Sequence, residues 1–297
     1  MKKVLSIHHR GEGHWVGDGF PVHSIFSYRN LAAELTPFLL LDHAGPAQFE
    51  PTEKPRGVDW HPHRGFETVS IAYEGEVSHE DTAGNRGTIR SGDVQWMTAG
   101  AGVLHKEMHG RDYAKRGGRF EMLQLWVNLP ANTKMTKPRY QTLLARDIPV
   151  VPLPGNGGAV RVIAGEFSGA TGPAQTFTPI NLLDVQLRAG HRLQLLLHNG
   201  YSAALYIMKG GIKVNDVDTA SETELVIFER AGDDAVIEAA SDATIFVMNG
   251  QPIDEPVVGH GPFVMNTQEQ ISQAFVDLHH GKFGDIPAVN RDGGIKN

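Results

Sequence analysis

The sequence predicts an all-β protein made of two tandem β-barrels, with one short helix near the C-terminal end. Short runs of β-branched, aromatic and other apolar residues recur through the chain, at 67–72, 123–127, 203–208 and 244–248. The 34 glycines and 17 prolines are spread among these runs, as expected when many turns join many strands. A chain of 297 residues also has room for two domains of ordinary size, each with its own core.

The order of strands and turns occurs twice. Segments 74–77 and 209–212 each contain a glycine turn followed by the start of a strand. Each is followed at the same distance by an aspartate, Asp81 in the first copy and Asp216 in the second. A polar turn and another apolar strand follow in each copy. This pattern indicates that one barrel was duplicated. Glycine turns between strands also look alike in unrelated β proteins, so this alternative stays open.

We place the two barrels at residues 1–135 and 136–297, and assign the terminal helix to the second. The helix is expected to begin at Thr267, which with Gln270 has the spacing of a capping box. Apolar residues then follow at helical spacing, and Gly281 is placed to end the helix. The apolar face is expected to pack on a barrel.

Composition excludes several classes of function. The formal net charge is -7 and no long basic run is present, so neither nucleic acid nor an anionic membrane is an expected partner. The chain has no cysteine, which excludes disulfides, thiolate catalysis and cysteine-bound zinc or iron–sulfur centres. The first apolar stretch, before His8, is too short for a signal-peptide core, so a cytoplasmic location is expected.

Two pairs of residues carry the chemistry that the sequence predicts. His61 and His63 are alternate residues of a predicted strand, so their side chains point to one face, and His105 and Glu107 repeat this arrangement. On neighbouring barrel strands the two pairs can converge on one metal ion. Three imidazoles and a carboxylate suit Fe(II), Mn, Co, Ni or Cu better than structural zinc. Four ligands leave open positions on a six-coordinate ion for water, oxygen or a substrate.

Longer motifs around these residues resemble the pirin family of the cupin superfamily. They are HPHRGFETV at 61–69, RSGDVQWMTAGAGVLHKEMH at 90–109, LQLWVNLP at 123–130 and GPFVMNTQEQISQAF at 261–275. The resemblance covers most of the chain, from about residue 22 to 284. It implies a bicupin, that is, two double-stranded β-helix (jelly-roll) barrels.

The resemblance also implies a cofactor and its ligands. In pirins one iron sits in the N-terminal barrel, held by residues that fall here on His61, His63, His105 and Glu107. We therefore expect one Fe(II) per chain, with Mn, Co, Ni, Cu or Zn as alternatives.

Glu67, His109 and two residues of the second copy also bear on this ligand assignment. In other cupins a glutamate shortly after the two histidines is a ligand, and Glu67 is near that position, so it remains a minor alternative. His109 continues the alternate series, but a fifth ligand would crowd the ion, so we expect it at the surface or beside the ligands. In the second copy Leu196 and His198 stand opposite His61 and His63, so no metal is expected there.

Residues near the predicted metal ligands are candidates for supporting roles. Arg64 and Gln124 are candidates for hydrogen bonds that orient the metal ligands. Aromatic and methionine residues near the site are candidates for lining the cavity, although such residues on strands are more often core: Phe66, Trp96, Met97 and Met122. Six further histidines lack a converging partner and are not expected to be functional: His8, His9, His14, His23, His279 and His280.

Two functions follow from the resemblance. The first is a dioxygenase that opens the ring of a flavonol such as quercetin, with Glu107 as the base and with an aromatic molecule and O₂ as substrates. The second is a non-enzymatic, iron-dependent redox-sensing regulator that binds a protein partner. The fold alone does not choose between them.

Overall fold

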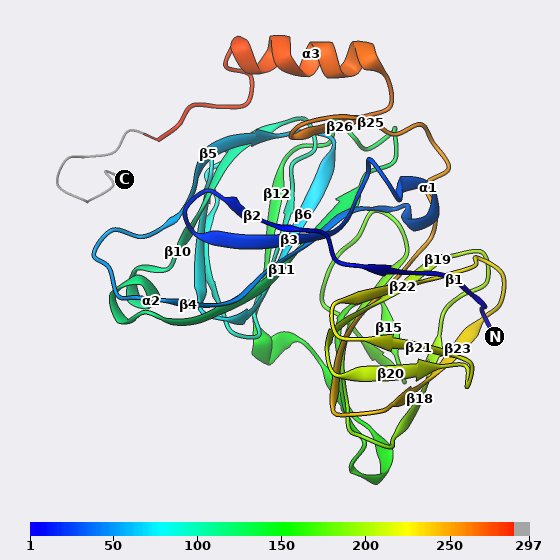
Figure 1. Cartoon of the computed structure of the whole chain (residues 1–297). Coiled ribbons are helices and arrows are strands. Elements are labelled where there is room, and N and C mark those ends of the chain that lie inside the picture. The colour runs from blue at the N-terminus through cyan, green and yellow to red at the C-terminus, as the bar shows by residue number, and fades with distance from the viewer. Residues whose placement is uncertain (288–297) are drawn as a thin grey trace.

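The structure is a computed structural model, and it describes residues 1–287. Two β-barrels lie side by side, each made of one seven-stranded and one four-stranded antiparallel sheet (Figure 1). The all-β class is confirmed, and the four strand segments expected from the sequence lie in strands β6 (Phe66–Glu74), β11 (Gly118–Asn128), β19 (Ser202–Lys209) and β24 (Ala243–Gly250).

The first barrel contains the strands that carry the predicted metal ligands. Its large sheet runs, in spatial order, β12 (Arg139–Leu143), β9 (Val94–Thr98), β6 (Phe66–Glu74), β11 (Gly118–Asn128), β4 (Phe38–Phe49), β3 (Phe20–Ser27) and β2 (Gly13–Val16). Its small sheet runs β5 (Gly57–His63), β10 (Val103–His109), β7 (Glu76–Asp81) and β8 (Arg86–Arg90).

The second barrel repeats this plan. Its large sheet runs β1 (Val4–His9), β22 (Glu224–Phe228), β19 (Ser202–Lys209), β24 (Ala243–Gly250), β17 (Ile180–Leu187), β14 (Gly158–Ala164) and β13 (Val150–Pro152). Its small sheet runs β18 (Arg192–Leu196), β23 (Asp234–Ala239), β20 (Gly211–Val214) and β21 (Asp218–Ser221). The small sheets have matching strand orders, as do the central strands of the large ones, which supports duplication of one barrel. The division of the chain at residue 135 stays a prediction, and the sheets cross it: β1, near the N-terminus, pairs with β22 in the second barrel, and β12, after residue 135, pairs with β9 in the first.

Short elements connect the sheets. They are the hairpins β15 (Glu166–Phe167) with β16 (Ala170–Thr171) and β25 (Val258–His260) with β26 (Phe263–Met265), the helices α1 (Ala32–Leu35), α2 (Arg111–Arg116) and α3 (Gln268–His279), and two 3₁₀ turns, Ala145–Asp147 and Pro154–Asn156. None of the helices in residues 1–287 has the length and apolar character needed to cross a membrane.

The barrels pack large sheet against large sheet. One continuous apolar core joins them, with Val69 and Leu125 from the first barrel and Leu182 and Phe246 from the second among its fully buried members. At the border of this core the Tyr73 hydroxyl donates a hydrogen bond to Asp184 across the barrel interface.

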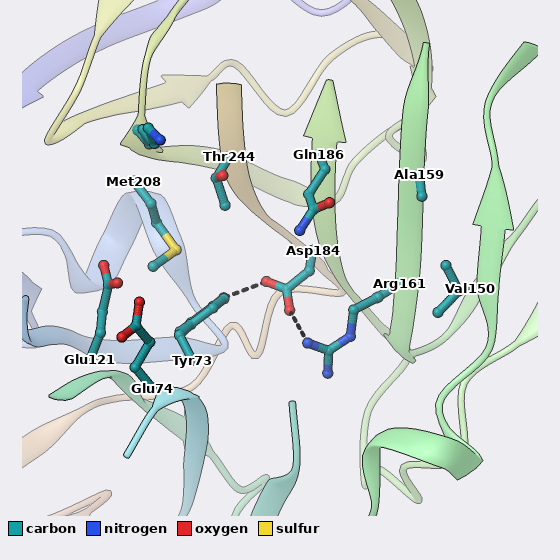
Figure 2. Close-up of a pocket in the computed structure, with 11 residues that line it drawn as sticks. Tyr73, Glu74, Glu121, Val150, Ala159, Arg161, Asp184, Gln186, Met208 and Thr244 are labelled. Atoms are coloured by element: carbon teal, nitrogen blue, oxygen red, sulfur yellow. Dashed lines mark hydrogen bonds and ion pairs between the residues drawn. The ribbon is translucent and has the colours of Figure 1, made fainter. Parts of the chain in front are cut away.

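Figure 2 shows Tyr73 and Arg161 on either side of the Asp184 carboxylate in a cavity of about 330 Å³ between the barrels. The Arg161 Nη1 lies 3.3 Å from Asp184 Oδ2. This network leaves the buried Asp184 carboxylate with a neutral donor on one side and a cation on the other, as a buried charge requires. It therefore ties the two barrels together.

The interiors of the two barrels differ. Aliphatic side chains fill the second, including Leu195, Leu205, Ile237 and Val247. In the first, aromatic and aliphatic residues such as Phe20 and Phe120 form only part of the interior, and the strands β5 and β10 bring polar side chains inward. The space for a ligand is therefore in the first barrel.

The C-terminal segment lies over the first barrel (Figure 1). Helix α3 begins as predicted, because Thr267 and Gln270 form a complete capping box. Its Asp277 accepts a hydrogen bond from Arg64 Nη1 at 2.8 Å. The helix belongs to the second half of the sequence but packs on the barrel built by the first half.

Candidate metal centre

The strands β5 and β10 are neighbours, and their pairing places His105 directly opposite His61. Residues of β10 alternate between buried and half-buried, so Val103, His105, Glu107 and His109 all point into the barrel. The alternate spacing seen in the sequence therefore puts the predicted ligands on the inner face of one small sheet.

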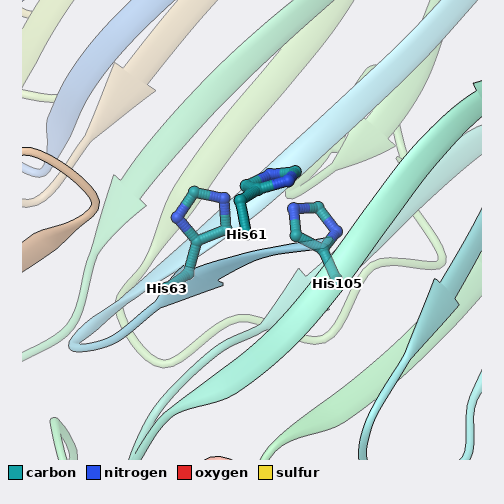
Figure 3. A group of neighbouring side chains, drawn as sticks. All are labelled: His61, His63 and His105. Atoms are coloured by element: carbon teal, nitrogen blue, oxygen red, sulfur yellow. The ribbon is translucent and has the colours of Figure 1, made fainter. Parts of the chain in front are cut away.

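Three imidazoles converge (Figure 3). The ring centroids lie 4.9 Å apart for His61 and His63, 4.2 Å for His61 and His105, and 4.8 Å for His63 and His105. One nitrogen from each ring lies within 4.8 Å of the others, which is compatible with a single ion among them. The structure thus brings together three of the four predicted ligands as one compact group.

Several nitrogens of these rings lack a hydrogen-bond partner among residues 1–287. The Nδ1 of His61 donates to the Asp59 carbonyl at 2.8 Å, so its lone pair is on Nε2. The buried Nδ1 of His63 and both ring nitrogens of His105 have no hydrogen-bond partner among residues 1–287. Buried polar atoms are rarely left unpaired, so these donors fit a bound cation.

Glu107 belongs to a second group that shares His105 with the first. Its members are His79, His105 and Glu107, all buried, with one ligand atom of each within 4.8 Å of the others. The His79 Nδ1 lies 3.3 Å from Glu107 Oε1, at ion-pair distance but not aligned as a hydrogen bond. The His79 side chain is the site residue that the sequence analysis missed.

Two neutral side chains fix the Glu107 carboxylate. The Ser70 hydroxyl lies 3.3 Å from Glu107 Oε1, and Gln124 Nε2 donates to Glu107 Oε2 at 3.5 Å. Ser70 also donates to the Gln124 amide oxygen at 2.6 Å, which turns the amide NH₂ toward Glu107. The predicted orienting role of Gln124 thus has a contact that supports it.

The electrostatics keep the ligands in the forms that bind a metal. Burial, with His61 adding to it, lowers the pKa of His63 to about 3. Burial also lowers the pKa of His105 well below its usual value, so both rings are neutral at pH 7. Burial would raise the pKa of Glu107, but the nearby His79 and His105 outweigh it and hold this pKa below its usual value. The carboxylate is therefore ionised.

Glu67, the minor alternative ligand, is in neither of these groups. It belongs to β6, beyond a sharp turn at Gly65 with φ of 89°, so the alternation that begins in β5 does not carry across. An added Cβ at Gly65 would lie 2.0 Å from the Val264 carbonyl oxygen, so the turn requires glycine. Glu67 instead accepts a hydrogen bond from Thr98 at 2.6 Å.

Two other expectations need correction. His109 is buried rather than at the surface, since its ring stacks on Phe120 at 4.9 Å and its Nε2 lies 2.9 Å from the Gly19 carbonyl oxygen. Within residues 1–287 the Arg64 side chain donates no hydrogen bond to a predicted ligand; its Nε donates to the Ala101 carbonyl at 2.7 Å, and its Nη1 donates to Asp277 of α3.

The ligands open on a cavity of about 340 Å³. His61, His63 and Glu107 lie at one side of it, and Trp126 and Met122 are among its apolar walls. Of the predicted lining residues Met122 is confirmed, whereas Trp96 and Met97 are buried in cores that do not line it. Phe66 stacks on Trp126 at 4.2 Å and meets His63 edge-on, so it supports the wall from behind.

The matching positions of the second barrel have a different environment. Leu196 is exposed at the end of β18, and His198 is exposed in the loop that follows, against the ring of Tyr201. Neither side chain enters the barrel interior, which the aliphatic core occupies.

Comparisons with known proteins agree with this architecture. The family model for pirin matches residues 19–127, and the model for the pirin C-terminal cupin domain matches residues 182–284. The chain belongs to the pirin family. The bicupin class implied by the resemblance is confirmed with it.

Relatives within this family cover nearly the whole chain. A Pseudomonas aeruginosa protein provisionally named quercetin 2,3-dioxygenase is 50% identical over 95% of this chain and 99% of its own. Human pirin is 39% identical over 84% of this chain and 83% of its own. A crystal structure of quercetin 2,3-dioxygenase from Acinetobacter baumannii is 49% identical, covers 96% of this chain and 99% of its own, and superposes with a TM-score of 0.94.

Proposed function

We propose that this pirin binds one metal ion, Fe(II), through His61, His63, His105 and Glu107 and acts as a dioxygenase on flavonols such as quercetin. The observation that carries the proposal is the cluster of buried imidazole nitrogens that have no hydrogen-bond partner within residues 1–287, at the wall of an apolar cavity. Relatives at about 50% identity that bear the name of this activity support the substrate class.

The donor set decides which ions fit. Three neutral imidazoles and one carboxylate suit Fe(II) and also Mn, Co, Ni, Cu and Zn, so Fe(II) rests on the family and not on the donors. When bound there, a redox-active metal supplies a Lewis acid for the substrate oxygen and a path for electrons between the substrate and O₂.

The chain's own residues have three tasks. The apolar walls, Trp126 and Met122 among them, bind a flat aromatic molecule and exclude water. Glu107, ionised and facing the same cavity, swings partly off the metal and accepts the proton of the flavonol hydroxyl as the substrate binds. Ser70 and Gln124 hold this carboxylate while it does so.

Replacing Glu107 by glutamine tests its role as the base. The amide keeps the size of the carboxylate but cannot take a proton, so we expect quercetin turnover to fall by about 10²–10⁴-fold. Metal content is measured by mass spectrometry on the same sample. Unchanged turnover with the metal retained would remove Glu107 from the proton transfer, and loss of the metal would show that it acts chiefly as a ligand.

The alternative, an iron-dependent regulator that binds a protein partner, uses the same centre. It predicts that the metal-loaded protein consumes no O₂ with flavonols. A partner and a cytoplasmic location both stay predictions from the sequence.

A further inference from the structure

A row of polar side chains crosses the large sheet of the first barrel beneath the metal centre. Ser24, Asp42, Gln124, Ser70 and Gln95 come from five neighbouring strands, and each is the register partner of the next. Residues directly opposite one another on antiparallel strands point to the same face, so all five share the inner face. Such a row interrupts an otherwise apolar interior.

One end of the row is explained by the metal centre. Ser70 and Gln124 orient Glu107 through the contacts described above. The Ser70 hydroxyl oxygen also lies 3.2 Å from Gln95 Oε1, so it contacts the next residue of the row. This half of the row therefore positions a metal ligand.

Positioning of a metal ligand does not explain the other end of the row, which consists of Ser24 and Asp42. Asp42 Oδ1 accepts a hydrogen bond from the Ser24 hydroxyl at 2.6 Å, and within residues 1–287 no hydrogen bond reaches Oδ2 and no ion pair involves Asp42. The side chain is half-buried and lines the same cavity as His61 and His63. Burial raises the pKa of Asp42, although the Ser24 hydrogen bond and nearby His14 oppose the shift.

The other residues that line the cavity indicate which kind of ligand would contact the Asp42 carboxyl group. The cavity residues between and around the polar groups are apolar: Val16, Phe20, Val22, Ala44, Val58, Met122, Trp126 and Pro262. A ligand that fits has an apolar body with at least two polar groups, one for the metal ligands and one for Asp42. A carboxyl oxygen with a free lone pair selects a hydrogen-bond donor such as a phenolic hydroxyl.

We propose that Asp42 is a specificity-determining residue that accepts a hydrogen bond from a ring hydroxyl of an aromatic substrate, other than the hydroxyl that faces the metal ligands. The site therefore takes polyhydroxylated aromatic molecules in preference to the same ring system without ring hydroxyls. The inference deepens the proposed flavonol dioxygenase function and rests on its substrate class.

The test is equilibrium binding to the full-length, Fe(II)-loaded protein without oxygen, so that no turnover occurs. The probes are quercetin and 3-hydroxyflavone, which keeps the hydroxyl for the metal side but has bare outer rings, and binding is followed by absorbance and fluorescence. The proteins are the wild type, Asp42→Ala, Asp42→Asn and the matched control Asp216→Ala, since Asp216 is an exposed aspartate of the second barrel.

We expect Asp42→Ala to weaken quercetin binding about tenfold, the effect of losing one hydrogen bond to a charged acceptor, and to change 3-hydroxyflavone binding less than twofold. Asp42→Asn keeps one acceptor oxygen and should lie between the wild type and Asp42→Ala; it carries the same comparison if the alanine variant does not fold. Asp216→Ala should match the wild type for both probes.

Equal weakening of both probes in the Asp42 variants would overturn the inference, because it would indicate damage to the cavity as a whole. Unchanged quercetin binding would overturn it too, as would a wild type that binds neither probe. The dioxygenase function fails separately: if the Asp42-dependent preference for quercetin is present but O₂ uptake is absent, only the proposed reaction is wrong.

Discussion

The buried Glu67 carboxyl group makes the stability of the first barrel depend on pH. It is 1% exposed, its Oε1 accepts a hydrogen bond from Thr98, and its Oε2 has no partner among residues 1–287. Burial raises its pKa to about 7, although the Thr98 hydrogen bond opposes the shift. The folded protein therefore favours the protonated form of this group.

The sign of the effect follows from proton linkage. Between the unfolded pKa of 4.5 and the folded pKa of about 7, the folded state binds more protons at Glu67 than the unfolded chain does. The free energy of unfolding contributed by this group is thus fully present below pH 4.5 and is lost as the pH rises through 7. A shift of this size corresponds to a loss of about 3 kcal/mol between the two limits.

Substituting Glu67→Gln removes the titration and keeps the size of the side chain. We expect the unfolding free energy of the variant, minus that of the wild type, to grow by about 2–3 kcal/mol from pH 5 to pH 8. The buried glutamine amide shifts the unfolding free energy of the variant by the same amount at every pH, so it does not change how this difference grows with pH. The assay is denaturant unfolding of both metal-free proteins at several pH values.

Parallel stability curves for the two proteins would refute the reasoning, because they would show that Glu67 has an ordinary pKa. The same variant tests the alternative ligand assignment. Since Glu67 is in neither donor group, metal content should be unchanged, and loss of the metal would contradict the geometry.

Three further outcomes are expected. His105→Ala removes the donor common to both groups, so metal content should fall below about a tenth of the wild-type value by mass spectrometry, whereas the matched His198→Ala in the second barrel should keep it. His79→Ala should weaken metal binding about 10–100-fold in a chelator competition, because Glu107 loses the buried neighbour at 3.3 Å; equal affinity would mean that His79 does not position it. Tyr73→Phe removes a hydrogen bond across the barrel interface and should lower the free energy of unfolding by about 1–2 kcal/mol, and unchanged stability would exclude a role in joining the barrels.

The side of the strand on which the proposed ligands lie could be predicted because strand alternation is a local rule. His105 and Glu107 share a strand, so spacing alone places both on its inner face. The same rule fails for Glu67, since the turn at Gly65 starts a new strand and resets the alternation. Local spacing holds within one strand and not across a turn.

His79 could not be found from spacing, because it is the single histidine of the strand β7. A signal was nevertheless present in the internal repeat. When Gly75 is matched to Gly210, His79 falls opposite Val214, a buried core residue of the second barrel. A histidine at a position that is apolar in the other copy indicates that this position has a polar role in the first barrel.

The packing of α3 was beyond what the sequence could show. The capping box at Thr267 and Gln270 identifies where the helix begins, since capping depends only on neighbouring residues. The partner of the helix depends on contacts far apart in the chain, such as the one between Arg64 and Asp277. For the same reason the row from Ser24 to Gln95 becomes visible only when strand order is known.

The central claim is that the first-barrel metal centre catalyses the reaction of O₂ with a flavonol. Its most direct test is O₂ uptake on addition of quercetin to protein loaded with Fe(II) in the absence of air, with His63→Ala as the control. We predict uptake that is catalytic, requires quercetin and is lost in the variant. Absence of uptake from wild-type protein shown to hold about one iron per chain would contradict the account and favour a binding protein.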